Sequence, residues 1–267
     1  MATLKHQNKW LNGWNPYKFK EIHFTCNLHG NVTMILDEWD PTVEEDGTIR
    51  AFHTSDDKIF VIIGENTLYA NEDSSYMFAE LIQCELIDGL HLINTKNVQN
   101  FASAFKHCGA NANFFTINGL EKWDVSNVTN MSSMFCGTGH DAKTWSVGDL
   151  SAWNVSSVTS MSYMFNGAGY SAPTWSVGDL FAWNVSNVTD MSWMFYYAGF
   201  YATTFSVGDL SAWNVSNVTD MYTMFNGAGF YATTWNIGDL SAWDVSKCKY
   251  HDDFKTQNKI IEPNWVS

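Results

Sequence analysis

The sequence has few basic residues and no long apolar run. Its 267 residues include 14 Lys and Arg against 28 Asp and Glu, which gives a net charge of −14. A chain this acidic repels the phosphates of nucleic acids and of anionic lipids. No run of about 18 apolar residues could cross a bilayer, and the start lacks the basic and apolar regions of a secretory signal. We therefore expect no nucleic-acid partner, no membrane span and synthesis in the cytoplasm.

Cysteine pairs and enzyme motifs are missing as well. The five Cys include no C-x-x-C pair, so neither a zinc knuckle nor a disulfide framework is expected. The sequence contains no G-x-S-x-G, H-E-x-x-H or phosphate-loop motif. The recurring GDL motif supplies one carboxylate per 30 residues, too few oxygens for calcium, so we expect its aspartates to cap turns: Asp149, Asp179, Asp209 and Asp239. We predict a protein that is not an enzyme and that needs no cofactor or metal.

The sequence does contain a repeat with a period of 30 residues. The string LSAWNVSNVTDM at 210–221 occurs almost unchanged as LFAWNVSNVTDM at 180–191. An early copy ends at Phe78, only 27 residues before Phe105, so the first unit is shorter than the others. One unit has too little apolar surface to offset its ordering entropy, so neighbouring units must share a core. The clearest landmarks of the period are Trp123, Trp153, Trp183, Trp213 and Trp243.

Within a unit the spacing of apolar residues changes part way. Leu150, Trp153 and Val155 have the L-x-x-L-x-L spacing in which a short strand points alternate side chains inward. The segments MSSMF and MSYMF that follow predict a turn or two of helix, which a polar N-cap begins and a glycine pair ends. We expect the Trp153 column in the core. We also favour core positions for a second aromatic column, which consists of Trp145, Trp175, Phe205 and Trp235.

The string WDVSNVTNMSSMF at 123–135 and its later copies resemble the BspA-like repeat, or DUF285 type, of mycoplasma surface proteins. The resemblance covers roughly residues 76–246 and implies a leucine-rich-like fold. It implies no single activity, although adhesion and host interaction are the usual suggestions. The connection GAGYSAPTWSVGD is longer than in the family's shorter repeat. Pattern and resemblance together predict an α/β repeat solenoid of the leucine-rich type, with about five to six coils of 27–30 residues.

Segments of different composition flank the repeat. Residues 1–70 contain apolar strands such as KIFVIIG around polar turns, which predicts a β-rich N-terminal cap. Residues 71–246 are predicted to form the solenoid. Residues 247–267 break the repeat and are expected to form a C-terminal cap or tail.

The long connection is where we expect a partner to bind, because extra residues in repeat proteins map to loops on one face. The strings GFYATTFSVGD and GFYATTWNIGD each place an aromatic pair there, and Tyr buries ring area while its hydroxyl keeps a hydrogen bond. A further ring, Phe181, stands where the regular copies have Ser or Glu. The alternative, that the four rings of the connections fold inward to fill a wider core, stays open. The candidate contact residues are Phe200, Tyr201, Phe230, Tyr231 and Phe181.

These features favour a non-enzymatic interaction or structural protein. In this hypothesis a rigid repeat rod contacts a protein neighbour or its own copies, in a surface or virion-type assembly, or acts as an adhesion module. A carbohydrate-binding module is the alternative. Ice binding is a minor one, because Thr203, Thr204, Thr233 and Thr234 lie in register over a short array.

Overall fold

The computed structural model describes residues 2–27, 33–256 and 259–265. In these ranges the chain forms short strands and short 3₁₀ helices, and no α-helix. The strands are β1 (Ala2–Thr3), β2 (Glu21–Thr25), β3 (Ile35–Trp39), β4 (Arg50–Thr54), β5 (Lys58–Ile62), β6 (Leu68–Tyr69), β7 (Leu86–Asp88), β8 (Ile93–Asn94), β9 (Phe114–Ile117), β10 (Thr144–Ser146), β11 (Thr174–Ser176), β12 (Thr204–Ser206) and β13 (Thr234–Asn236). The 3₁₀ helices are η1 (Gln7–Leu11), η2 (Pro16–Lys18), η3 (Leu90–Leu92), η4 (Leu120–Lys122) and η5 (Leu180–Ala182).

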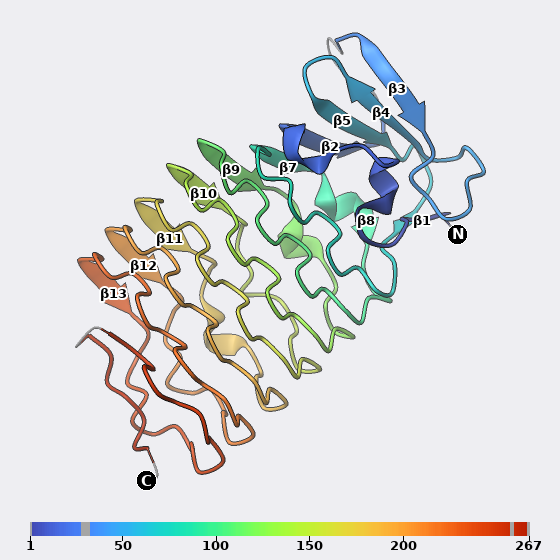
Figure 1. Cartoon of the computed structure of the whole chain (residues 1–267). Helices are drawn as coiled ribbons and strands as arrows, with labels where there is room; N and C mark the ends of the chain where they lie inside the picture. Colours follow the sequence, from blue (N-terminus) through green and yellow to red (C-terminus); the bar gives the residue numbers. More distant parts are fainter. Residues whose placement is uncertain (1, 28–32, 257–258, 266–267) are drawn as a thin grey trace.

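The strands form three sheets (Figure 1). The largest has the order β10-β9-β7-β2-β5-β4-β3, in which β3, β4 and β5 are antiparallel and the other neighbours are parallel. The sheets β1-β6-β8 and β11-β12-β13 are parallel throughout. Because β2 pairs with both β5 and β7, the N-terminal strands continue directly into the strands of the repeat.

The predicted α/β repeat solenoid is therefore wrong. The described chain is β-rich, three sheets organise it, and its only helices are the short 3₁₀ segments. In the structure, the strands of successive units pair with each other so that residues one period apart lie side by side. Phe205 pairs with Trp175 on one side and with Trp235 on the other, each one period away.

The segments expected to be helical are runs of turns. The main-chain N–H groups of Met131 and Ser133 donate to the carbonyls of Ser160 and Ser162 in the next unit, at 3.0 and 2.8 Å. The N–H of Met134 instead donates to Met131 O, three residues back. Ser133 also has a φ of 57°, outside the helical region. In an α-helix, every N–H group donates a hydrogen bond to the carbonyl four residues earlier. Here every second N–H group donates to a carbonyl of the next unit instead.

The core consists of columns that run through successive units. The Trp153 column is buried as predicted, with exposed fractions of 3–4% in all five members, and in the second aromatic column only Trp235, in the last unit, is partly exposed. A further column of Phe residues stacks with ring centroids 5.1–5.5 Å apart: Phe78, Phe105, Phe135, Phe165, Phe195 and Phe225. All five Cys are free.

The two ends of the row of units are covered. Figure 1 shows the units side by side from β7 to β13, with the N-terminal strands at one end and the last segment of the chain at the other. In that segment Ile261 accepts a hydrogen bond from the N–H of Leu240 at 3.1 Å, and buried Phe254 packs edge-on against Phe225.

Candidate functional site

The contact residues predicted on the long connections lie at the surface. Tyr201, Phe230 and Tyr231 are 51%, 40% and 55% exposed, and Phe200 is half-buried. The ring of Tyr201 stacks on that of Tyr231 with centroids 5.3 Å apart, and Phe200 stacks on Phe230 at 5.2 Å. These rings therefore do not fill the core, and their role as contact residues stays a prediction.

Phe181 lies apart from this group. It belongs to η5 and is 54% exposed, and its N–H donates to Asp179 Oδ1 at 2.9 Å. Within the described ranges no ring contact joins Phe181 to the four rings of the connections. The cap on Phe181 is the one predicted for the GDL aspartates, and Asp149, Asp209 and Asp239 each accept the equivalent bond.

The rings of the connections belong to a longer stacked column. Tyr170 stacks on Phe200 at 5.1 Å with planes 3° apart, and His140 stacks on Tyr170 at 4.6 Å. These residues occupy the same position in consecutive units. Neighbouring strands lie about 4.8 Å apart, a separation that suits offset ring stacking. The period thus turns one aromatic position per unit into a continuous column.

A second group of rings joins this column from the side. Tyr163 stacks on Trp193 at 5.5 Å, Trp193 packs edge-on against Tyr196 at 4.5 Å, and Tyr196 packs against Tyr197 at 4.3 Å. Tyr197 then meets Phe200 at 4.9 Å, which closes the connection. We call the combined patch the ring surface; its members are Tyr163, Tyr170, Trp193, Tyr196, Tyr197, Phe200, Tyr201, Tyr222, Phe230 and Tyr231.

The residues that join the two groups are not among those predicted from the sequence. Tyr196 and Tyr197 stand where the preceding unit has Asn166 and Gly167. The signal was the string FYYAGF in place of FNGAGY, a local departure from a strict repeat.

The chain that builds the ring surface is uncharged. Residues 161–178, 191–208 and 221–238 contain no Asp, Glu, Lys, Arg or His. Burial raises the pKa of the Tyr163, Tyr170 and Tyr196 hydroxyls, and neighbouring Asp or Tyr side chains raise it further. These hydroxyls therefore stay protonated at neutral pH, where each can donate and accept a hydrogen bond.

A trough with a volume of about 430 Å³ opens beside the ring surface. Three of its lining residues, Tyr170, Tyr196 and Tyr197, belong to that surface, and two more are the imidazoles of His107 and His140. The remaining lining consists of small or amide residues and one thiol. The trough therefore combines aromatic rings with polar groups, and its lining contains no Lys, Arg, Asp or Glu.

Carboxylates hold both imidazoles of the trough. His107 Nδ1 lies 3.0 Å from Glu80 Oε1, and His140 Nδ1 lies 2.7 Å from Asp141 Oδ1. A carboxylate favours a proton on Nδ1, which makes Nε2 the nitrogen that can accept a hydrogen bond from another group. The thiol of Cys136 is not activated, because burial raises its pKa and it stays protonated near neutral pH.

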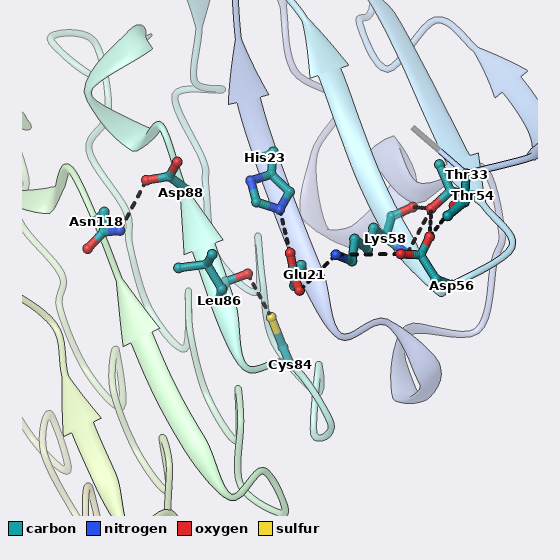
Figure 2. Close-up of polar contacts among 10 residues, drawn as sticks. All are labelled: Glu21, His23, Thr33, Thr54, Asp56, Lys58, Cys84, Leu86, Asp88 and Asn118. Atoms are coloured by element: carbon teal, nitrogen blue, oxygen red, sulfur yellow. Dashed lines mark hydrogen bonds and ion pairs between the residues drawn. The ribbon is translucent and has the colours of Figure 1, made fainter. Parts of the chain in front are cut away.

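A separate polar network lies on β2, β5 and β7 (Figure 2). Glu21 lies 2.8 Å from His23 Nε2 and 3.1 Å from Lys58 Nζ. Burial raises the pKa of Glu21, but the bonds from His23 and Lys58 more than offset this and lower it overall. On the other side of β2, Asn118 donates to Asp88 at 3.1 Å. Glu21 and His23 pair within β2, whereas Lys58 and Asn118 pair with groups of a neighbouring strand, and such cross-strand pairs stabilise the seven-stranded sheet.

The described residues offer no metal site and no membrane-spanning helix. In residues 2–27, 33–256 and 259–265, no three His, Cys, Asp or Glu side chains form a group that could hold a metal ion. In the same part of the chain, no helix has the length and apolar character needed to span a bilayer.

Comparison with known proteins gives one family. The model of DUF285, described as a Mycoplasma protein of unknown function, matches residues 72–172 and 170–262. Neither the curated proteins nor the solved structures gave a match. The two matched segments cover well over half of the chain and include the whole ring surface, so the protein belongs to the DUF285 family.

Proposed function

We propose that the protein is a non-enzymatic interaction protein whose ring surface contacts a protein neighbour in an assembly or at a cell surface. The observation that carries the proposal is the exposure of Tyr201, Phe230 and Tyr231 within one continuous patch of rings. A contiguous exposed apolar patch on an otherwise polar surface is typical of an interaction site. Tyr and Trp are the residues most often central to such contacts.

The charge pattern favours a neighbour whose contacting surface is itself uncharged. The chain carries −14 overall, so two copies repel each other across most of their surfaces. The segments of the ring surface, 161–178, 191–208 and 221–238, contain no charged residue. A second copy meets the least repulsion there, and it is the neighbour that we propose first.

The backbone supports a rigid contact surface. The N–H of Gly199 donates to Ala168 O in the unit before, at 3.0 Å, and the N–H of Tyr231 donates to Phe200 O at 3.2 Å. Because the connections are tied to each other by such bonds, the rings are ordered before a partner arrives. A preordered surface loses less entropy on binding.

The test replaces Tyr201 and Tyr231 together by Ser. Serine is chosen because Ser171 occupies the same position in the preceding unit. We expect the original protein to form larger species as its concentration rises, measured by light scattering and sedimentation, and the double variant to remain a monomer with an unchanged unfolding midpoint. The matched control is Phe181→Ser, which removes an equally exposed ring elsewhere and should leave association intact. If the unmodified protein stays monomeric at concentrations up to about 1 mM, where even weak self-association becomes visible, the second-copy proposal is contradicted.

A further inference from the structure

The trough exists because side chains are missing from one column of the repeat. Its members are His107, Gly137, Gly167 and Tyr197, one period apart. His107 and Tyr197 have φ values of 56° and 52°, close to the 66° and 63° of the two glycines, so the backbone is nearly the same with or without a side chain. The two glycines therefore leave a gap between an imidazole and a phenol.

The floor of this gap is open at Gly167. A Cβ added to Gly137 would lie 2.5 Å from Cδ2 of His107, so the His107 ring already covers that glycine. A Cβ on Gly167 would have only Cδ2 of His140 nearby, at 3.7 Å. The ring of Tyr197 lies over Gly227, in the next unit, and does not fill the space beside Gly167.

The groups around the floor are aromatic rings and polar hydrogen-bonding groups. Tyr170 and His140 form a stacked pair on the trough, and Tyr196 and Tyr197 contribute two further phenols. Nε2 of His140 accepts hydrogen bonds when Asp141 holds the proton on Nδ1. The amide of Asn166 adds a donor and an acceptor.

This composition excludes two kinds of ligand. The trough has no Lys or Arg in its lining, and the carboxylates of Glu80 and Asp141 already bond to its two imidazoles, so the lining offers no fixed positive charge to a phosphate or carboxylate. Its lining also has no large aliphatic side chain, so it offers little to an apolar peptide. A ligand with apolar C–H faces and neutral hydroxyl edges fits both requirements, since aromatic faces pack against the former and imidazole and amide groups bond to the latter. The volume lies in the range of small-molecule sites, about 300–1,000 Å³.

We propose that this trough binds a short neutral saccharide, with Gly167 as its floor, the rings of Tyr196 and Tyr197 as its aromatic lining, and His140 and Asn166 as hydrogen-bonding groups. The site shares Tyr170, Tyr196 and Tyr197 with the ring surface, but it uses neither Tyr201 nor Tyr231, the residues whose replacement tests the protein contact.

The experiment measures saccharide binding to the full chain by saturation-transfer NMR and calorimetry. The probes are maltose, cellobiose, lactose and N-acetylglucosamine disaccharide, with a sialylated and a sulfated saccharide as charged counterparts. We expect at least one neutral probe to bind and the charged counterparts to bind less well. If no neutral saccharide binds at about 10 mM, a concentration above the dissociation constant of almost any specific complex, the proposal is overturned. Tighter binding of the charged saccharides than of the neutral ones would overturn it as well.

Two variants locate the site. Gly167→Asn fills the floor with a residue that tolerates a positive φ, and Asn166→Ala removes the amide, which keeps the test valid if the first variant does not fold. Each should weaken binding about tenfold or more, the effect of roughly 1.4 kcal/mol. Unchanged binding by a folded Gly167→Asn or Asn166→Ala variant would overturn the placement.

The Tyr201→Ser, Tyr231→Ser double variant separates this proposal from the preceding one. We expect it to bind saccharide as the original protein does, whatever its effect on association. Loss of saccharide binding in this variant, with the fold intact, would contradict the trough as the site.

Discussion

The indole Nε1 of Trp183 donates a hydrogen bond of 3.0 Å to the main-chain carbonyl of Leu150, 33 residues earlier in the chain. The same bond occurs in every member of the Trp column, from Trp123 to Leu90 through Trp243 to Leu210. Each buried ring thus ties its own unit to the unit before through a polar group as well as through packing.

Replacing Trp183 separates these two contributions. Trp183→Ala should lower the free energy of unfolding by about 3–5 kcal/mol, because it leaves a large cavity in the middle of the row. Trp183→Phe keeps much of the volume and loses the indole bond, so its own cost should be smaller, near the 1 kcal/mol of a typical hydrogen bond. Urea denaturation checks both values. Equal losses in the two variants would show that the cavity contributes little.

A second link between units involves the side chain of Asn187. Its Nδ2 donates to Ser156 O at 2.7 Å, and in the preceding unit Ser157 Oγ makes the equivalent bond to Ser126 O at 2.7 Å. Asn187→Ser should therefore be nearly neutral, whereas Asn187→Ala should cost about 1 kcal/mol. Thermal unfolding of the pair provides the measurement, and a serine variant as unstable as the alanine variant would disagree with it.

Two glycines with the same backbone conformation differ in their surroundings. Gly208 and Gly148 both have a φ of 79°. A Cβ on Gly208 would lie 1.8 Å from Asp179 Oδ1, the oxygen that caps Phe181, whereas a Cβ on Gly148 would meet nothing closer than 3.7 Å. Gly148→Ala should cost about 1–2 kcal/mol from the left-handed backbone alone. Gly208→Ala should cost roughly 1–3 kcal/mol more, because the cap must move. Denaturation midpoints that coincide would refute the clash.

The carboxyl of Asp56 gives stability a pH dependence in the acid range. Hydrogen bonds from Thr33 and Thr54 lower its pKa from 3.8 to about 2 in the folded state (Figure 2). A depressed folded pKa means that the unfolded chain binds the proton first, so the stabilisation is complete above pH 3.8 and is lost as the pH falls toward 2. Thr54→Val should raise the pKa of Asp56, as followed by NMR titration, and should flatten this part of the stability profile. An unchanged titration curve would rule out the Thr54 bond as a cause.

The burial of the Trp column could be predicted from the sequence, whereas the backbone conformation of the segment around Ser133 could not. The spacing of Trp153 and its equivalents was enough to place the Trp column in the core, because only a buried position explains an invariant large apolar residue in every unit. The helix was wrong because Met131, Met134 and Phe135 have the spacing of a helical face. A positive φ at Ser133, in the middle of that segment, has no sequence signature, since Ser, Tyr, Trp and Thr all occupy it in different units.

The candidate site was predictable in part. Tyr201 and Tyr231 stood out because they repeat, and the structure places them at the surface. Tyr196, Tyr197 and the gap at Gly167 are departures that occur once or twice, and a repeat analysis averages over such departures. Their significance depends on which neighbours lie one period away, which becomes visible only when the units are stacked.

The alternation of main-chain bonds within and between units has a mechanical consequence. The N–H groups of Met131, Ser133, Phe135 and Gly137 donate to carbonyls of the next unit along the row, and the N-terminal strands and the last described segment lie at opposite ends of that row (Figure 1). A force that pulls the ends apart therefore loads these bonds in tension, one boundary after another. Each rupture releases about 30 residues, a contour of roughly 100 Å at about 3.4 Å per residue. Under a steady pull the molecule should lengthen in equal steps, starting from an end.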